Sequence, residues 1–210
     1  MITEKDWTDA LISRHGEELH KRFSSATVAV CGLGGLGSNI ATALARSGIG
    51  KLLLIDFDCV DVTNLHRQQY KASQIGRYKA EALAENLLEM APYTKIHTLT
   101  VKITEENFAE LLKEADIVCE AFDHAESKAM LVNGVLEQLP HCYLVAASGM
   151  AGMNTPNTIR TRKIMKRFYL CGDEVSEAAD NVGLMAPRVM LCAAHQAHTV
   201  LRILAGEYEV

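Results

Sequence analysis

Short apolar runs alternate along the first two thirds of the chain with segments in which apolar residues recur every three or four positions. The runs have the length and composition of strands covered on both faces, and they occupy residues 27–32, 51–56, 95–101, 116–122 and 141–147. The periodic segments between them predict helices at 36–48, 76–90, 105–114 and 125–138. Right-handed crossovers place such helices on both faces of one sheet. The pattern therefore predicts an α/β fold with a doubly wound, mostly parallel Rossmann-like sheet.

The pattern changes after residue 150. Residues 157–164 and 167–170 predict antiparallel strands, and residues 184–205 predict a long helix that closes the chain. Residues 1–24, ahead of the first strand, predict a helical segment. No repeat or linker divides the sequence, so we expect one domain over residues 1–210.

Composition narrows the classes of protein. The chain has 210 residues, 49% of them hydrophobic, and a net charge of -5 without any run of five like charges, so we expect no nucleic-acid partner. The amino terminus lacks the apolar core of a signal peptide, and the longest uncharged stretch, 139–159, is interrupted by proline and glycine. Six cysteines without a C-x-x-C pair suit reduced thiols. We expect a cytoplasmic protein without membrane association or disulfides.

A glycine-rich turn joins the first predicted strand to the first helix. Gly32, Gly34 and Gly37 fit the pattern G-x-G-x-x-G, and Gly35 lies between them. Glycines here let backbone N–H groups approach a phosphate at a helix N-terminus. The motif does not distinguish a dinucleotide from ATP, and a tight packing turn without a ligand has the same glycines.

The second predicted strand ends in a cluster of polar side chains. A carboxylate at Asp56 can accept hydrogen bonds from ribose hydroxyls. Beyond it lie amide, carboxylate and cationic groups that suit a polyphosphate better than a nicotinamide, although each alone can be a solvated surface residue. They are Asp58, Asn64, Arg67, Gln68 and Lys79.

Asp123 follows the fourth predicted strand and has two interpretations. Asp123 and Glu126 have the D-x-x-E spacing of a capping box that starts a helix at residue 124. A carboxylate at the end of a central strand can also hold Mg²⁺ against phosphates. The two roles are compatible.

In combination these motifs resemble the ThiF/MoeB/HesA family, the bacterial relatives of the ubiquitin-activating enzymes. The resemblance covers about residues 14–206 and rests on "GLGGLGSN", "IDFDCVDVTNLHRQ", "IGRYKAEAL", the "FD" after the fourth strand and "LMAPRV". It implies ATP-dependent adenylylation of the C-terminal glycine of a small ubiquitin-like sulfur carrier protein ending in Gly-Gly. This sequence is more compact than many members of the family. It looks most like a compact ThiF-type subgroup in thiamine biosynthesis, with a ThiS-like carrier.

The resemblance also implies roles for individual residues. Asp56 holds the ribose, Arg67 and Lys79 the phosphates, Asn64 the nucleotide near the reacting centre, and Asp123 the Mg²⁺. Arg14 matches in position an arginine that reaches across a homodimer to the partner's phosphates, and a surface arginine on an amphipathic helix is the alternative.

The family's two C-x-x-C pairs are missing here, so we expect no structural zinc. Cys171 alone remains in the first region, in a polar segment that we expect to be exposed. It is either a relic of the zinc site or a thiol that bonds to the carrier.

Two other functions remain open at this level. One is an NAD-dependent oxidoreductase of Rossmann type, and the other is a catalytically silent binding relative. If the protein is an adenylyltransferase, its carrier protein can also be a molybdopterin-type or other carrier.

Overall fold

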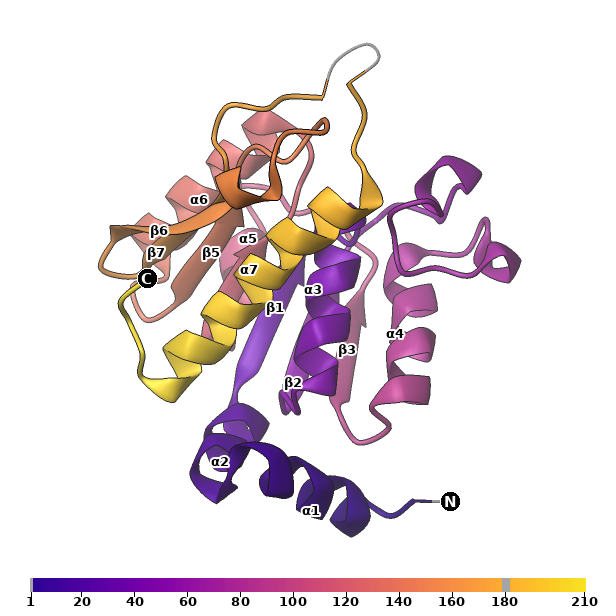
Figure 1. Cartoon of the computed structure of the whole chain (residues 1–210), viewed down its shortest axis with the longest axis vertical. Helices are drawn as coiled ribbons and strands as arrows, with labels where there is room; N and C mark the ends of the chain where they lie inside the picture. The colour runs from indigo at the N-terminus through magenta and orange to yellow at the C-terminus, as the bar shows by residue number, and fades with distance from the viewer. Residues whose placement is uncertain (1, 179–181) are drawn as a thin grey trace.

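A computed structural model describes residues 2–178 and 182–210, and within them the chain forms one seven-stranded sheet (Figure 1). The strand order is β3-β2-β1-β4-β5-β7-β6, and all neighbouring strands are parallel except β6 and β7, which pair antiparallel. The order reverses between β1 and β4, where ligands bind in doubly wound sheets. The strands are β1 (Thr27–Cys31), β2 (Lys51–Ile55), β3 (Lys95–Leu99), β4 (Ile117–Glu120), β5 (Tyr143–Ala147), β6 (Arg160–Met165) and β7 (Phe168–Gly172).

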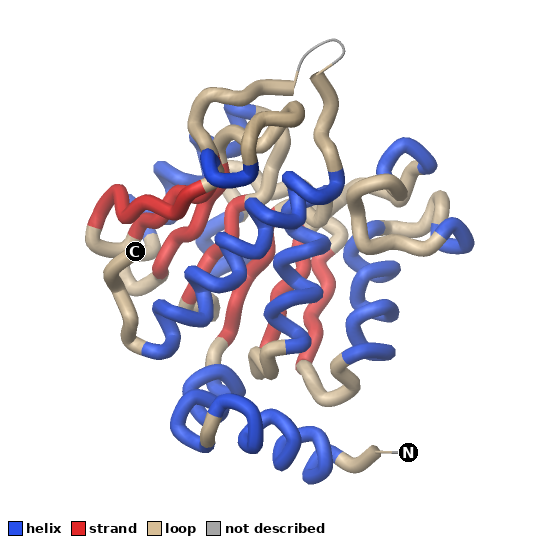
Figure 2. The backbone as a smooth tube through the Cα atoms, in the orientation of Figure 1, coloured by secondary structure: helices blue, strands red, loops and turns tan. Residues whose placement is uncertain are grey.

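Helices cover both faces of the sheet. One face carries α3 (Gly35–Arg46), α4 (Lys79–Met90) and α7 (Ala186–Ala205), and the other carries α5 (Phe108–Leu112) and α6 (Ala125–Gln138) (Figures 1 and 2). Along β1, Val28 and Val30 belong to the core under α3 and α7, whereas Ala29 and Cys31 belong to the core under α5 and α6. Because both faces are buried, the strands read as continuous apolar runs, and the predicted fold class is confirmed.

The amino-terminal helices α1 (Glu4–His15) and α2 (Glu17–Ser25) lie at the end of the sheet where the parallel strands begin (Figure 1). No residue of α1 is fully buried. Its Leu11 packs against the turn before β2, since a Cβ on Gly48 would lie 2.7 Å from Leu11 Cδ1. Helix α1 is therefore at the opposite end of the sheet from the glycine-rich turn.

Helix α4 and the last two strands differ from the prediction in ways that matter for the site. Helix α4 begins at Lys79 and not at residue 76, because Gly76 has a φ of +85° and Tyr78 pairs in an isolated β-bridge with Cys59. The predicted antiparallel pair exists as β6 and β7, but β7 also pairs in parallel with β5 and so extends the main sheet.

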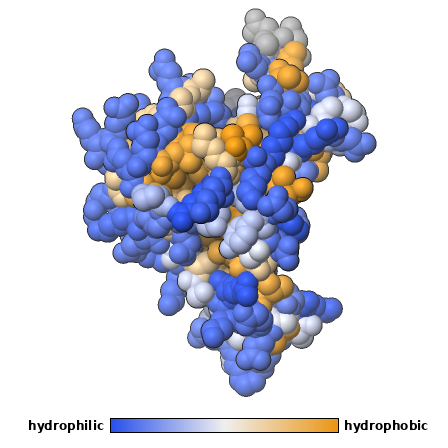
Figure 3. Space-filling view, turned by 90° about the vertical axis from the view of Figure 1, so that its left-hand side faces the viewer, coloured by the Kyte–Doolittle hydropathy of each residue, from blue (hydrophilic) through white to orange (hydrophobic). Residues whose placement is uncertain are grey.

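The edge strand β6 carries the features that keep sheet edges from pairing with other chains. Its ladder with β7 is interrupted between Lys163 and Met165, and Arg160 at its start is exposed. Charged residues and irregularities on an edge strand disfavour edge-to-edge association. Viewed from this side, the surface is largely hydrophilic, with hydrophobic residues exposed in several places (Figure 3). Among the described residues, no helix has the length and apolar character of a membrane span.

Candidate nucleotide-binding site

The glycine-rich turn requires glycine for two physical reasons. Gly32 has a φ of +88°, and a Cβ on it would lie 2.8 Å from the carbonyl oxygen of Ala121. A Cβ on Gly37 would lie only 1.8 Å from the carbonyl oxygen of Gly32, so α3 approaches β1 closely. Helix α3 begins at Gly35 with Gly34 as its N-cap, and no side chain of the described residues caps it. Its first N–H groups and dipole are therefore available to an anion.

The Asp56 carboxylate links the glycine-rich turn to the loop after β2 through two hydrogen bonds. Its Oδ2 accepts a hydrogen bond from the Leu33 N–H at 2.6 Å, and its Oδ1 accepts one from the Asp58 N–H at 2.8 Å. Burial raises the pKa of the Asp56 carboxyl, while the Asp58 N–H and the Lys79 ammonium lower it. Each carboxylate oxygen keeps a further acceptor site, so the side chain fits a ribose-binding role.

Two polar atoms beside the glycine-rich turn are buried without a hydrogen-bond partner within the described residues. They are Nε of Arg67 and Oε1 of Gln68. The Arg67 aliphatic chain lies 3.5 Å from the Cβ position of Gly35, and Gln68 Nε2 lies 3.8 Å from that of Gly34. Buried polar groups are nearly always paired in folded proteins. A donor and an acceptor without partners at this place fit a polar ligand such as a nucleotide.

Lys79 is buried and already paired. Its Nζ lies 2.9 Å from Asp58 Oδ2, and its side chain is 9% exposed against 51% for that of Asp58. The backbone joins the same two residues, since the Lys79 N–H donates to the Asp58 carbonyl at 2.8 Å. The structure thus places Asp58 as the counter-ion of Lys79, a relation that spacing in the sequence did not show.

The side chain of Asn64 is engaged locally. Asn64 ends the 3-10 turn η1 (Val62–Asn64), where its Oδ1 accepts from the Asp61 N–H at 3.3 Å. In turn, Asp61 accepts from the Thr63 N–H at 2.8 Å. This reciprocal cap shapes the loop that ends in Arg67.

Asp123 lies at the carboxyl end of β4, and its side chain is 88% exposed. The expected capping box is wrong: α6 begins at Ala125 with His124 as N-cap, and no side chain caps it. The helix starts one residue too late for Asp123 to accept from its first turn. The His124 Nε2 atom lies 3.7 Å from Asp123 Oδ1. A free carboxylate at the switch point between β1 and β4 fits Mg²⁺, which takes one or two protein carboxylates together with phosphates and water.

Two other predicted site residues lie elsewhere. Cys171 is not exposed but fully buried in β7, and burial raises the pKa of its thiol to about 11. The prediction that Cys171 is exposed is therefore wrong. A buried neutral thiol is also a poor nucleophile. Arg14 is in the last turn of α1, at the far end of the sheet from Arg67 and Lys79 of its own chain (Figure 1).

An open hollow of ≈ 600 Å³ borders Arg67, with its lining drawn from the η1 loop and from the segment before α7. It is lined by Thr63, His66, Arg67, Ala178, Val182, Gly183 and Leu184. His66 Nε2 lies 3.3 Å from the carbonyl oxygen of Leu184 and joins the two segments. Neither His66 nor Leu184 was predicted from the sequence as a site residue, because only the fold brings the two residues together.

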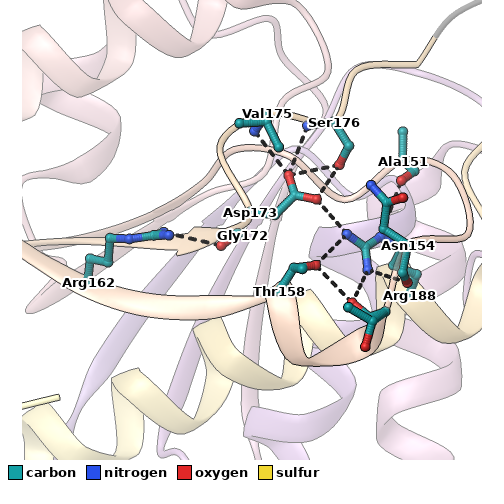
Figure 4. Close-up of polar contacts among 10 residues, drawn as sticks. Ala151, Asn154, Thr158, Arg162, Gly172, Asp173, Val175, Ser176 and Arg188 are labelled. Carbon is teal, nitrogen blue, oxygen red and sulfur yellow. Dashed lines mark hydrogen bonds and ion pairs between the residues drawn. The ribbon is translucent and has the colours of Figure 1, made fainter.

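A buried ion pair joins the start of α7 to the end of β7 (Figure 4). Arg188, in the first turn of α7, lies 2.5 Å from Asp173, which directly follows β7. The same guanidinium donates to the carbonyl oxygens of Ala151, Asn154 and Thr155 and to the Thr158 hydroxyl. One side chain thus joins α7, the end of β7 and the connection between β5 and β6.

Residues 8–210 match the sequence pattern of the ThiF family. The chain belongs to the ThiF family. Its matched relatives include the adenylyltransferase and sulfurtransferase UBA4 of Lodderomyces elongisporus, which is 30% identical over 90% of this chain and 42% of that protein. The tRNA threonylcarbamoyladenosine dehydratase of Escherichia coli is 34% identical over 72% of this chain and 57% of that protein. The sulfur carrier protein adenylyltransferase of Thermus thermophilus is 31% identical over 58% of this chain and 45% of that protein.

This ThiF-family chain therefore spans about half the length of those relatives. Among solved structures, the E. coli tRNA N6-threonylcarbamoyladenosine dehydratase, TcdA, in complex with ATP superposes with a TM-score of 0.87 at 23% identity. The superposition covers 99% of this chain and 98% of that chain. At this identity the likeness is one of fold, and it confirms the Rossmann-like ThiF architecture.

Proposed function

We propose that this protein adenylylates the C-terminal glycine carboxylate of a small ubiquitin-like sulfur carrier protein, with ATP as the adenylyl donor. A carboxylate oxygen attacks the α-phosphorus, the bond from that phosphorus to the bridging oxygen breaks, and pyrophosphate leaves. The products are an acyl adenylate and pyrophosphate. The relatives named adenylyltransferases support this reaction class.

One observation supports the proposal most directly. Within the part of the chain that the structure describes, Arg67 Nε and Gln68 Oε1 are buried without hydrogen-bond partners beside a helix N-terminus that no side chain caps, and Asp56 lies across the same turn. This arrangement offers backbone N–H groups and a guanidinium to phosphates and a carboxylate to a ribose. It is a nucleotide site whose cations favour a polyphosphate, and we assign ATP to it.

Each site residue has a specific task in this proposal. Arg67 stabilises the negative charge that develops at the phosphates, and Lys79 exchanges part of its interaction with Asp58 for a phosphate oxygen. Asp123 is the residue that would hold Mg²⁺, which neutralises charge on the phosphates when bound. Asn64 keeps the η1 loop in shape, so its role is to position Arg67.

The carrier's identity is the finer part of the proposal. The resemblance to compact ThiF-type proteins supports a ThiS-like carrier for the thiazole of thiamine, and a molybdopterin-type carrier is the alternative within the same chemistry. We also propose a homodimer, in which Arg14 of each subunit serves the partner's site.

A second substrate class comes from the relatives named tRNA threonylcarbamoyladenosine dehydratases. Activation of a carboxylate on a tRNA base would use the same nucleotide site. The net charge of -5, however, does not favour a polyanionic partner. We therefore place the carrier protein first.

The deciding experiment measures exchange of labelled pyrophosphate into ATP in the presence of Mg²⁺. A carrier ending in Gly-Gly should support exchange, and the same carrier without its last glycine should not. Asp123→Asn should lower the exchange strongly, to a small but measurable residual rate, while the thermal midpoint stays unchanged. Exchange that needs threonylcarbamoyladenosine-containing tRNA would reject the carrier in favour of the tRNA, and nicotinamide-dependent absorbance changes without exchange would reject the adenylyltransferase.

A further inference from the structure

Asp123 itself makes no side-chain hydrogen bond among the described residues, so its position depends on the backbone on either side. That connection runs over residues 121–127, from the end of β4 to the first turn of α6. Glu120 ends β4, and Lys128 closes the first turn of α6, since the Lys128 N–H donates to the His124 carbonyl at 3.0 Å. The two residues therefore flank the connection.

A charged contact joins these two flanking residues beneath the connection. Lys128 Nζ lies 3.0 Å from both carboxylate oxygens of Glu120, and the Glu120 side chain is 1% exposed. Lys128 Nζ also donates to the Ala147 carbonyl at the end of β5, at 3.0 Å. The Glu120 carboxylate accepts from the Phe122 N–H at 2.7 Å, one residue before Asp123.

The same connection packs on the glycine-rich turn. The Ala121 N–H donates to the Cys31 carbonyl at 2.9 Å, and a Cβ on Gly32 would lie 3.0 Å from Phe122 Cδ1. A displacement of residues 121–123 would therefore change both the place of Asp123 and its distance from the phosphate-binding turn.

Burying an ion pair gives little net stability, because desolvation of the two charges offsets their attraction. An apolar pair of similar volume is often as stable. Stability alone thus does not account for a carboxylate that is 1% exposed at this position. Unlike an apolar pair, the Glu120 carboxylate forms directional hydrogen bonds with the Phe122 N–H and with Lys128. These bonds fix the path of the backbone into Asp123.

We propose that Glu120 and Lys128 are positioning residues that hold the Asp123 carboxylate over the glycine-rich turn. The inference rests on the proposed function for the task of Asp123, but the backbone restraint itself can be measured without it. Neither residue touches the nucleotide, and both act through residues 121–123.

The test uses a variant in which both charges are removed, Glu120→Met with Lys128→Met. Because no lone buried charge remains, we expect it to fold with a thermal midpoint near that of the parent. We expect amide hydrogen exchange at Phe122 to become faster, and pyrophosphate exchange to fall roughly 10- to 100-fold, the size typical of misplacing a catalytic group. Lys128→Arg, which keeps a cation, should retain most of the parental rate.

A double-mutant cycle shows whether the pair acts through Asp123. In the Asp123→Asn background, removing the pair should lower the residual rate less than twofold, because the group it positions is already gone. Lys51→Met, which removes an ion pair with Glu114 at the opposite end of the sheet, serves as the matched control and should leave the rate unchanged. The proposal is overturned if the pair-deleted variant exchanges pyrophosphate at the parental rate, or if the pair costs the same factor with and without Asp123. A parent protein that shows no exchange would instead refute the proposed function, while the Phe122 amide measurement would still report on the restraint.

Discussion

At the level of single residues, the site combines groups that are already paired with groups that are not. Asp56 accepts from two backbone N–H groups, and Lys79 is neutralised by Asp58. Arg67 differs from both, because its Nε has no hydrogen-bond partner among residues 2–178 and 182–210, although its NH1 donates to the Thr63 carbonyl at 3.1 Å. Its loop contacts hold the guanidinium in place while leaving hydrogen-bonding capacity for a ligand. Such preorganisation is what an electrostatic catalyst needs.

Replacement of Arg67 tests this arrangement. Arg67→Ala should lower the rate of carrier-dependent pyrophosphate exchange by roughly 10²–10³, or about 2.7–4 kcal/mol, the loss typical of removing one such donor. Arg77→Ala is a suitable control, since Arg77 forms a surface ion pair with Glu85 and should change the rate little. A well-folded Arg67→Ala protein with parental exchange would contradict the assignment.

At the level of elements, the junction of β7 and α7 is held by a network centred on Asp173 and Arg188. Burial alone raises the pKa of Asp173, but hydrogen bonds from the Ser176 N–H and hydroxyl, the Val175 N–H and Arg188 outweigh it and bring the pKa to about 2. The ordinary value is 3.8. Because the folded-state pKa is depressed, Asp173 adds stability above pH 3.8, and this contribution is lost as the pH falls toward 2.

This linkage gives a pH prediction for the free energy of unfolding. At pH 6, Asp173→Asn should cost about 3–5 kcal/mol, because Arg188 then stays buried without its counter-ion. The difference between parent and variant should shrink by roughly 1.5 kcal/mol between pH 6 and pH 2.5. Urea unfolding of both proteins over this range measures it. A difference that stays constant with pH would mean that Asp173 does not have a depressed pKa in the folded protein.

At the level of the whole molecule, Arg14 lies at the wrong end of the sheet to serve the site of its own chain (Figure 1). Helix α1 carries it beyond the amino ends of the strands, whereas Arg67, Lys79 and Asp123 are at the carboxyl ends. An arginine placed so can contribute only to another subunit or to the surface. In a two-fold dimer, Arg14 of each subunit would lie near the nucleotide site of the other subunit, so the same contact would occur twice.

Mixing two inactive variants tests the dimer. Arg14→Ala and Lys79→Ala should each be nearly inactive as pure homodimers. After subunit exchange, a heterodimer has one site with the intact Lys79 of one chain and the intact Arg14 of the other, so roughly a quarter of all sites should recover. Pyrophosphate exchange before and after mixing measures this, with differently tagged chains to confirm that subunits exchanged. Confirmed exchange without regained activity would reject the cross-subunit role.

The sequence by itself determined the fold class and the edge of the sheet that carries the site. Apolar runs of strand length require a sheet covered on both faces, and the carboxyl ends of parallel strands meet at one edge. Glycine at positions 32 and 37 follows from backbone geometry that no other residue fits, so the turn was also predictable. These features are local or periodic, and a pattern along the chain records them.

Only the tertiary structure decided how the side chains are paired. The contact of Asp58 with Lys79 spans 21 positions, and that of Gln196 with the Glu120 carbonyl spans 76. Burial of Cys171 depends on the pairing of β7 with both β5 and β6, which an alternating pattern does not specify. The start of α6 at Ala125 removed the expected cap from Asp123 by a single residue, because capping depends on where the backbone turns helical. Spacing in sequence names the residues of a site, but packing decides which of their charges are already neutralised and which are left for a ligand.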